Sequence, residues 1–295
     1  MKKFLLALLV LCSAPAAAGP MKLDDYLALS GPPASAKFAY GSAPSQYAEL
    51  FLPSGTGPFP VVVLVHGGCW TVRFGGIAQM HNLAGALAAR GIAVWNVEYR
   101  RIDEEGGGYP GTYQDIEAAL DALAANAESQ QLDLRRLAAV GHSAGGQLVQ
   151  WLAGRARIAP TSPLYQAKPL LVNEIISLGG LADLRNEKDL IKASCGRDTE
   201  QLAGKPSAVR PDVFSDTNAA ELIPNGSHTV LVNGALDTIS PPRAAHDYAE
   251  RVRKAGDSAE TVILPEASHY DEVATTSPAW KLILPLLERA VGKIP

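Results

Sequence analysis

One serine of the chain lies in a turn whose neighbours can make it reactive. Within residues 137–146, an apolar strand pattern runs directly into the turn Gly141-His142-Ser143-Ala144-Gly145. A Gly-x-Ser-x-Gly turn between a strand and a helix is a nucleophile elbow, because its glycines let the serine hydroxyl stand at the tip of a sharp turn. The helix expected over about 144–155 points its N-terminus at that hydroxyl and favours negative charge there. The pattern predicts Ser143 as the nucleophile of an acyl transfer; the alternative is a serine that caps the helix.

A serine hydroxyl needs a base, and the base needs an acid that holds its tautomer. Among the six histidines, His269 follows the last expected strand, at the carboxyl edge of the sheet where Ser143 is also expected. Asp237 follows the strand expected over 229–233 and reaches the same edge. The chain order Ser143, Asp237, His269 is the order that accompanies this elbow. His142 flanks the nucleophile and is expected to point away from it.

Each of these two partners has a structural alternative. His269 could be an ordinary loop histidine, and Asp237 could cap the helix that follows it. Weaker candidates for the acid lie in or just before the segment 184–225: Asp183, Asp212 and Asp216.

An acyl-transfer enzyme also needs backbone N–H donors for the oxyanion, each worth about 3 kcal/mol. The continuous β-branched run Val61–Val65 leads into His66-Gly67-Gly68-Cys69-Trp70. Its glycines allow the backbone to approach a ligand closely, so the N–H groups of Gly68 and Cys69, with that of Ala144, are predicted to form the oxyanion hole. The rest of the loop is expected to support it: His66, Gly67 and Trp70. A tight turn is the alternative interpretation.

Strands and helices alternate from this run onward, after an antiparallel pair expected over 36–40 and 46–52. Repeated β-α units imply an α/β fold with a mainly parallel twisted sheet and helices on both faces. The chain is predicted to form a single domain over 19–295. Residues 184–225 carry many turn-forming residues and are interpreted as a small cap insertion over the site, with a mobile surface loop as the alternative.

Composition excludes several classes of partner and cofactor. The 295 residues are 47% hydrophobic and 19% charged, with a formal net charge of −4. Since no long run of basic residues is present, no nucleic-acid partner is expected. No cluster of His, Cys or carboxylates has metal-ligand spacing, so no metal and no organic cofactor is expected.

The first eighteen residues predict export. Lys2-Lys3, the apolar run Phe4–Cys12 and the small residues Ala16–Ala18 form a secretory signal with cleavage near Ala18/Gly19. The apolar run is too short to span a bilayer, so no stable membrane anchor is expected. The expected location is the periplasm or the exterior, where disulfides persist. The two remaining cysteines, Cys69 and Cys195, are therefore either a disulfide or two buried thiols.

The chain resembles an α/β-hydrolase of the esterase/lipase group with a His-Gly-Gly-x-Trp oxyanion loop. Three segments carry this resemblance besides the elbow: His66–Trp70, Tyr99-Arg100 with Tyr109-Pro110 and Asp115, and Ser177–Gly180 with Asp183-Leu184. The His66–Trp70 loop is also similar to that of kynurenine formamidases. The resemblance implies a serine hydrolase that cleaves a small-molecule carboxylic ester through an acyl-enzyme.

The alternatives to an ester hydrolase are an arylformamidase or a small serine exopeptidase. A binding protein on an inactive scaffold is disfavoured, because every member of the triad and the oxyanion loop is present. The sequence leaves acyl specificity and oligomeric state open. Four aromatic residues are candidates for a substrate pocket or for ordinary packing: Trp70, Trp95, Tyr109 and Phe214.

Overall fold

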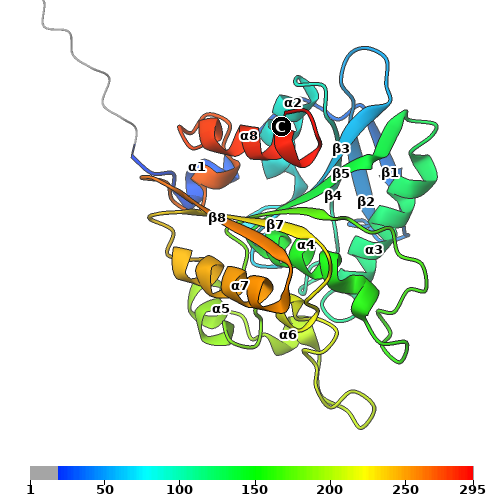
Figure 1. The fold of residues 1–295 in the computed structure, drawn as a ribbon, viewed down its shortest axis with the longest axis vertical. Coiled ribbons are helices and arrows are strands. Elements are labelled where there is room, and N and C mark those ends of the chain that lie inside the picture. Colours follow the sequence, from blue (N-terminus) through cyan, green and yellow to red (C-terminus); the bar gives the residue numbers. More distant parts are fainter. Residues whose placement is uncertain (1–18, 295) are drawn as a thin grey trace, which may run out of the picture.

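The structure, a computed structural model, describes residues 19–294 (Figure 1). The predicted export signal lies outside the described residues. Among residues 19–294, no helix combines the length and the apolar character needed to cross a membrane.

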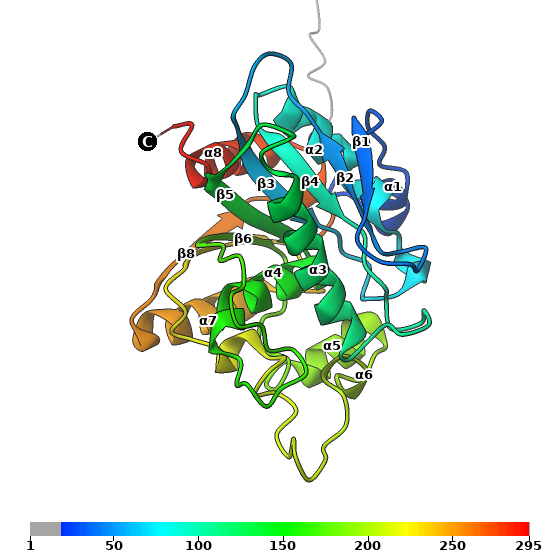
Figure 2. The ribbon, with the colours of Figure 1, turned by 90° about the vertical axis from the view of Figure 1, so that its right-hand side faces the viewer.

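Within residues 19–294, eight strands form one sheet in the order β1-β2-β4-β3-β5-β6-β7-β8. The strands β1 and β2 form an antiparallel hairpin at one edge, and β2 also pairs antiparallel with β4; all other neighbours are parallel (Figure 2). Their bounds are β1 Ala36–Ala39, β2 Tyr47–Phe51, β3 Phe59–Val65, β4 Ala93–Val97, β5 Leu132–His142, β6 Glu174–Leu178, β7 His228–Gly234 and β8 Ser258–Leu264. The predicted edge hairpin and the predicted mainly parallel sheet are confirmed.

Helices cover both faces of this sheet, as predicted (Figure 1). On one face lie α1 (Leu23–Leu27), α2 (His81–Ala88) and α8 (Trp280–Ala290), and on the other lie α3 (Gly111–Asn126), α4 (Ala144–Gly154) and α7 (Pro242–Ala255). The side chains of β3 alternate between the two cores, since Val61, Val63 and Val65 pack with α3 and α4 while Val62 and Leu64 pack with α2. The continuous β-branched run therefore belongs to a strand buried on both faces.

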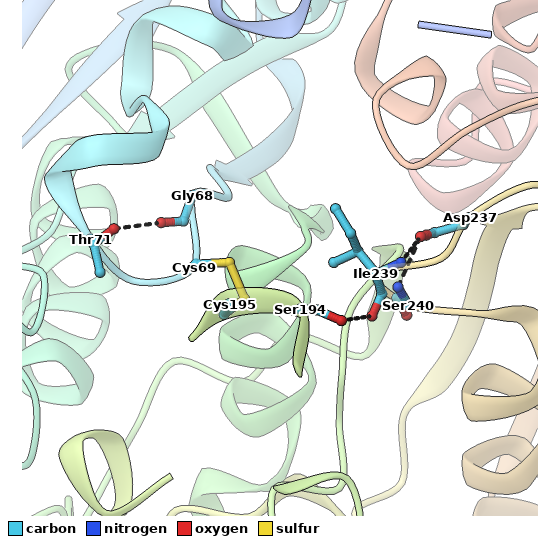
Figure 3. The surroundings of a disulfide bond; sticks show 8 residues. All are labelled: Gly68, Cys69, Thr71, Ser194, Cys195, Asp237, Ile239 and Ser240. Carbon is cyan, nitrogen blue, oxygen red and sulfur yellow. Dashed lines mark hydrogen bonds between the residues drawn. A yellow bond between two sulfur atoms is a disulfide. The ribbon is translucent and has the colours of Figure 1, made fainter. Parts of the chain in front are cut away.

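The remaining elements are short. They are the helices α5 (Lys188–Cys195) and α6 (Glu200–Ala203) and the 3₁₀ turns η1 (Val72–Phe74), η2 (Ile77–Met80), η3 (Arg155–Arg157), η4 (Ala219–Glu221) and η5 (Asp271–Val273). The helices α5 and α6 lie between β6 and β7, inside the segment that the sequence predicts as a cap. A disulfide joins Cys195, at the end of α5, to Cys69 in the loop after β3, with 5.5 Å between their Cα atoms (Figure 3). This segment is thus fastened to the predicted oxyanion loop.

Candidate active site

Ser143 occupies a sharp turn between β5 and α4. Its φ of 52° lies in the left-handed region, which is uncommon for a residue other than glycine and typical of functional turns. The turn needs its glycines, because a Cβ on Gly141 would overlap the carbonyl oxygen of Gly145 and a Cβ on Gly145 would overlap that of Val65. The Gly-x-Ser-x-Gly pattern therefore forms the sharp strand-to-helix turn that the sequence indicates.

His269 and Asp237 form a buried hydrogen-bonded pair. The Nδ1–H of His269 donates to Oδ2 of Asp237 over 2.7 Å. The other carboxylate oxygen, Oδ1, accepts the backbone N–H groups of Ile239 at 2.7 Å and Ser240 at 2.9 Å (Figure 3). His269 lines the same pocket as Ser143. With Nδ1 engaged by the carboxylate, Nε2 of His269 is the ring nitrogen left for proton transfer.

The weaker candidates for the acid are engaged elsewhere. Each carboxylate is bound by an arginine, and none lines the pocket of Ser143 among the described residues: Asp183 is bound by Arg251, Asp212 by Arg185 and Asp216 by Arg210. These ion pairs hold the segment between β6 and β7 in place.

The loop after β3 presents its backbone to the same pocket. Gly68, Cys69 and Trp70 have φ values of 110°, 51° and 55°, so the chain turns through three consecutive left-handed conformations. A Cβ on Gly67 would lie 3.0 Å from the Cβ of Ser143, which shows how closely the loop approaches the elbow. The N–H groups of Gly68, Cys69 and Ala144 donate to no acceptor among residues 19–294. They are therefore free for a substrate oxygen.

His66 and Glu98 support the loop that follows β3. The Nε2 atom of His66 lies 2.7 Å from Oε1 of Glu98, and the His66 ring stacks on Tyr99 with 4.4 Å between centroids. Burial of Glu98 opposes its ionisation, but the nearby His66 and Arg101 outweigh this and lower the pKa of Glu98 to about 2. Trp70 is buried, and its carbonyl accepts the N–H of Ile102 at 2.9 Å.

His142 does not point away from the site, so that prediction was wrong. Its ring lines the pocket with its centroid 4.7 Å from that of the His269 ring, and its Nε2 lies 3.0 Å from the His269 carbonyl oxygen. Burial, reinforced by the neighbouring His269, lowers the pKa of His142 well below its ordinary value. A neutral ring protonated at Nε2 can donate to that carbonyl, and this contact ties the loop of His269 to the elbow.

The pocket encloses about 50 Å³ above Ser143 and has a largely apolar wall. Its larger uncharged side chains come from four separate parts of the chain: Leu23, Tyr26, Phe74, Ile239 and Tyr270. Among the described residues, no Lys, Arg, Asp or Glu side chain lines it. None of the aromatic residues proposed from the sequence contributes to the lining: Trp70, Trp95, Tyr109 and Phe214.

The sequence analysis missed several residues of this region, among them three that matter for the site's construction. Leu23 and Tyr26, on α1, lie far upstream of the elbow, and their only signal is a helical spacing of apolar residues. Glu272, on η5, is completely buried beneath the pair of His269 and Asp237. Its position three residues after the histidine carries no motif that could have singled it out.

The parallel sheet with its antiparallel edge, the elbow after β5 and the His269–Asp237 pair at the carboxyl ends of the strands define an α/β-hydrolase of the esterase/lipase group. Within this group, the chain belongs to the BD-FAE family, whose model matches residues 49–252. The resemblance to esterases that the sequence motifs indicate is thereby confirmed at the level of family and fold.

Individual relatives are distant. The chain is similar to a probable isoprenylcysteine alpha-carbonyl methylesterase of Arabidopsis thaliana, with 25% identity over 245 residues that cover 79% of this chain and 56% of that protein. The chain therefore spans about half the length of this relative. Among solved structures, it is similar to a truncated carbohydrate esterase from gut microbiota, with a TM-score of 0.72 and 17% identity over 93% of this chain and 99% of that one. It is also similar to esterase B from Lactobacillus Rhamnosis, with a TM-score of 0.73 and 18% identity over 91% of this chain and 89% of that one.

Proposed function

We propose that the protein is an exported serine hydrolase that cleaves small-molecule carboxylic esters through an acyl-enzyme. One observation carries this proposal: the 2.7 Å His269–Asp237 pair faces the pocket that also holds Ser143 and the backbone of Gly68 and Cys69. A nucleophile, a base with its acid, and free N–H donors are the parts that acyl transfer requires.

The proposed reaction has two halves. In the first, Ser143 Oγ attacks the ester carbonyl carbon while Nε2 of His269 takes the hydroxyl proton. The oxyanion accepts N–H groups from Gly68, Cys69 and Ala144, and Asp237 stabilises the imidazolium. The intermediate then collapses, His269 returns the proton to the leaving alcohol, and an acyl-Ser143 ester remains. In the second half, water attacks this ester by the same steps and frees the serine.

The pocket lining favours an ester over the two alternative substrates. N-formylkynurenine and the terminal residue of a peptide carry charged amino or carboxylate groups, which need charged or strongly polar partners when they are desolvated. Within the described chain, no Lys, Arg, Asp or Glu side chain lines the pocket to pair with such a group. A cavity of about 50 Å³ holds only a few water molecules, so we expect a short acyl group such as acetyl.

Export is part of the proposal and has two supports. The first is the signal pattern of Lys2-Lys3, Phe4–Cys12 and Ala16–Ala18. The second is the Cys69–Cys195 disulfide, a bond that persists in the periplasm and outside the cell but is reduced in most cytosols.

A substrate panel tests this function. The purified protein is given p-nitrophenyl esters of rising acyl length, N-formylkynurenine and an aminoacyl anilide, beside a Ser143→Ala variant as the inactive control. We expect the acetyl and butyryl esters to have the highest kcat/KM, and the variant to lose several orders of magnitude in kcat. Faster turnover of the formamide or the anilide would contradict the assignment as an ester hydrolase. Equal turnover by Ser143→Ala and the wild type would show that Ser143 is not the nucleophile.

A further inference from the structure

Glu272 is a buried carboxyl for which the reaction above has no use. It lies on η5, it is fully inaccessible to solvent, and its Oε1 accepts the N–H of Gly234 over 2.7 Å. The other oxygen, Oε2, receives no hydrogen bond from any donor of residues 19–294. A buried carboxylate oxygen without a donor is costly, so this atom needs another explanation.

The unpaired oxygen lies against the His269–Asp237 pair. A Cβ on Gly179 would overlap Oε2 of Glu272 and would also lie 2.8 Å from Nδ1 of His269, so no side chain separates the two groups. The Asp237 carboxylate accepts from the same Nδ1 atom over 2.7 Å, and its charge acts on Glu272. Two carboxyl groups and the imidazole thus share one buried site.

The charges around Glu272 decide which of the two carboxyls holds a proton. The titratable groups that face it are Asp237 from the loop after β7, His142 from the end of β5, and His269 and Asp271 from its own loop. None of these four is a lysine or an arginine. Two adjacent carboxyls buried in this way do not both ionise, so one of them holds a proton.

The proton belongs to Glu272 rather than to Asp237. Asp237 accepts three hydrogen bonds, from His269 and from two backbone N–H groups, and these stabilise its ionised form. Glu272 accepts only the N–H of Gly234. Burial first, and then the neighbouring Asp237, raise the pKa of Glu272 well above its ordinary value. A protonated Glu272 turns the unpaired Oε2 into a donor whose acceptor is the Asp237 carboxylate.

We propose that Glu272 is a positioning residue of the triad, whose protonated carboxyl donates a hydrogen bond from Oε2 to Asp237. This inference rests on the proposed function, since it assigns the residue that holds the acid of the same site. The bond fixes the plane of the Asp237 carboxylate against His269 and draws off part of its negative charge. The imidazolium that forms during the reaction is then less strongly stabilised and returns its proton to the leaving alcohol more readily. Glu272 keeps its own proton throughout.

Two substitutions give opposite expectations. Glu272→Gln keeps a neutral donor of the same shape. The acidic limb of the pH profile of kcat/KM is therefore expected at the same pH as in the wild type. Glu272→Leu removes the donor, which makes Asp237 a stronger partner for the imidazolium. The acidic limb then moves to higher pH by about 0.5 to 1 unit, and kcat falls about tenfold as His269 loses its orientation. If Glu272 were ionised instead, the Gln variant would remove a negative charge and its limb would move to lower pH.

The matched control is Glu117→Gln. Glu117 is also a buried carboxyl, its pKa is raised to about 7, and the charged groups near it are Arg155 and Asp121, outside the pocket. The acidic limb of the pH profile and the kcat of Glu117→Gln are expected to match those of the wild type. A shift in this variant equal to that of Glu272→Leu would show that any buried carboxyl perturbs the profile.

A spectroscopic measurement separates this proposal from the proposed function, because it needs no turnover. The infrared difference between the wild type and Glu272→Gln is recorded at neutral pH, where the bands of Glu117 and Glu187, present in both proteins, cancel. We expect a protonated-carboxyl C=O band that is missing from the variant. Absence of that band, a downward shift of the limb in Glu272→Gln, or an unmoved limb in Glu272→Leu would overturn the proposal. If the wild type hydrolysed no ester while the band was present, only the proposed function would fail.

Discussion

Replacing Cys195 by serine removes the disulfide and leaves Cys69, which lines the pocket, unchanged in sequence (Figure 3). The bond closes a loop with a sequence separation of 126. In the chain-entropy model, opening a loop of that length lowers the free energy of unfolding by about 5 kcal/mol. For a chain of this size each kcal/mol corresponds to about 2 °C, so the variant is expected to unfold about 10 °C below the wild type.

The same substitution is expected to reduce turnover. Cys69 has a left-handed backbone conformation and supplies one proposed oxyanion donor, and the disulfide anchors it to α5. Losing one such donor altogether costs about 100- to 1,000-fold in kcat. Because Cys195→Ser loosens the donor but leaves it in place, we expect kcat to fall about tenfold. KM should change less, since the donor acts mainly in the transition state.

Thermal unfolding and steady-state hydrolysis of p-nitrophenyl acetate, each with and without a reductant, measure both effects. The reductant should bring the wild type to the values of Cys195→Ser and leave the variant unchanged. Alkylation of the unfolded, unreduced protein, followed by peptide mass spectrometry, then locates any free thiol. Free thiols at both Cys69 and Cys195, or a melting temperature that the reductant does not lower, would refute the reasoning.

Four further substitutions test the assignment of the site and of the buried carboxyls. Asp237→Asn should lower kcat about 10⁴-fold, because it favours the wrong tautomer of His269. Asp216→Asn, which alters a carboxylate bound to Arg210, should lower thermal stability and leave kcat near the wild-type value. The reverse result would assign the catalytic acid to Asp216. Gly179→Ala places a methyl group against the Glu272 carboxyl at a backbone φ of 59°, so kcat should fall at least tenfold, and wild-type kcat would count against the packing described for this site. Burial raises the pKa of Glu117 to about 7, so the folded state disfavours its charged form and stability falls as the pH rises from its ordinary pKa to about 7. Glu117→Gln should therefore gain melting temperature relative to the wild type between pH 5 and 8, and a gap that does not change with pH would contradict this.

Local sequence patterns predicted the sheet well, and they also indicated where the candidate site lies on it. The continuous run Val61–Val65 and the Gly-x-Ser-x-Gly turn each depend on contacts with immediate neighbours, which is why their spacing indicates their structure. The placement of His269 and Asp237 followed from one topological rule, that the carboxyl ends of parallel strands meet at one edge. The observed 2.7 Å pair agrees with that rule.

Other features depend on contacts between distant segments and have no local pattern. Tyr26 lines the pocket because α1 packs beside the loop of His269, where its ring lies 5.5 Å from that of Tyr270. The orientation of His142 follows from how that loop folds back over β5, which the elbow motif does not describe. Likewise, the sequence could name the two cysteines but not the 5.5 Å between their Cα atoms, because that distance is set by the packing of α5.

The central claim is that Ser143 is the nucleophile of an ester hydrolase, and covalent labelling tests it most directly. The folded protein is treated with a fluorophosphonate, which phosphonylates a serine only where a base and an oxyanion hole activate it. Esterase activity is followed during the reaction, and peptide mass spectrometry locates the adduct. The account predicts one adduct, on Ser143, that forms in step with the loss of activity and is absent from the His269→Ala variant. Complete inhibition with the adduct on another residue, or full labelling of Ser143 with activity retained, would contradict it.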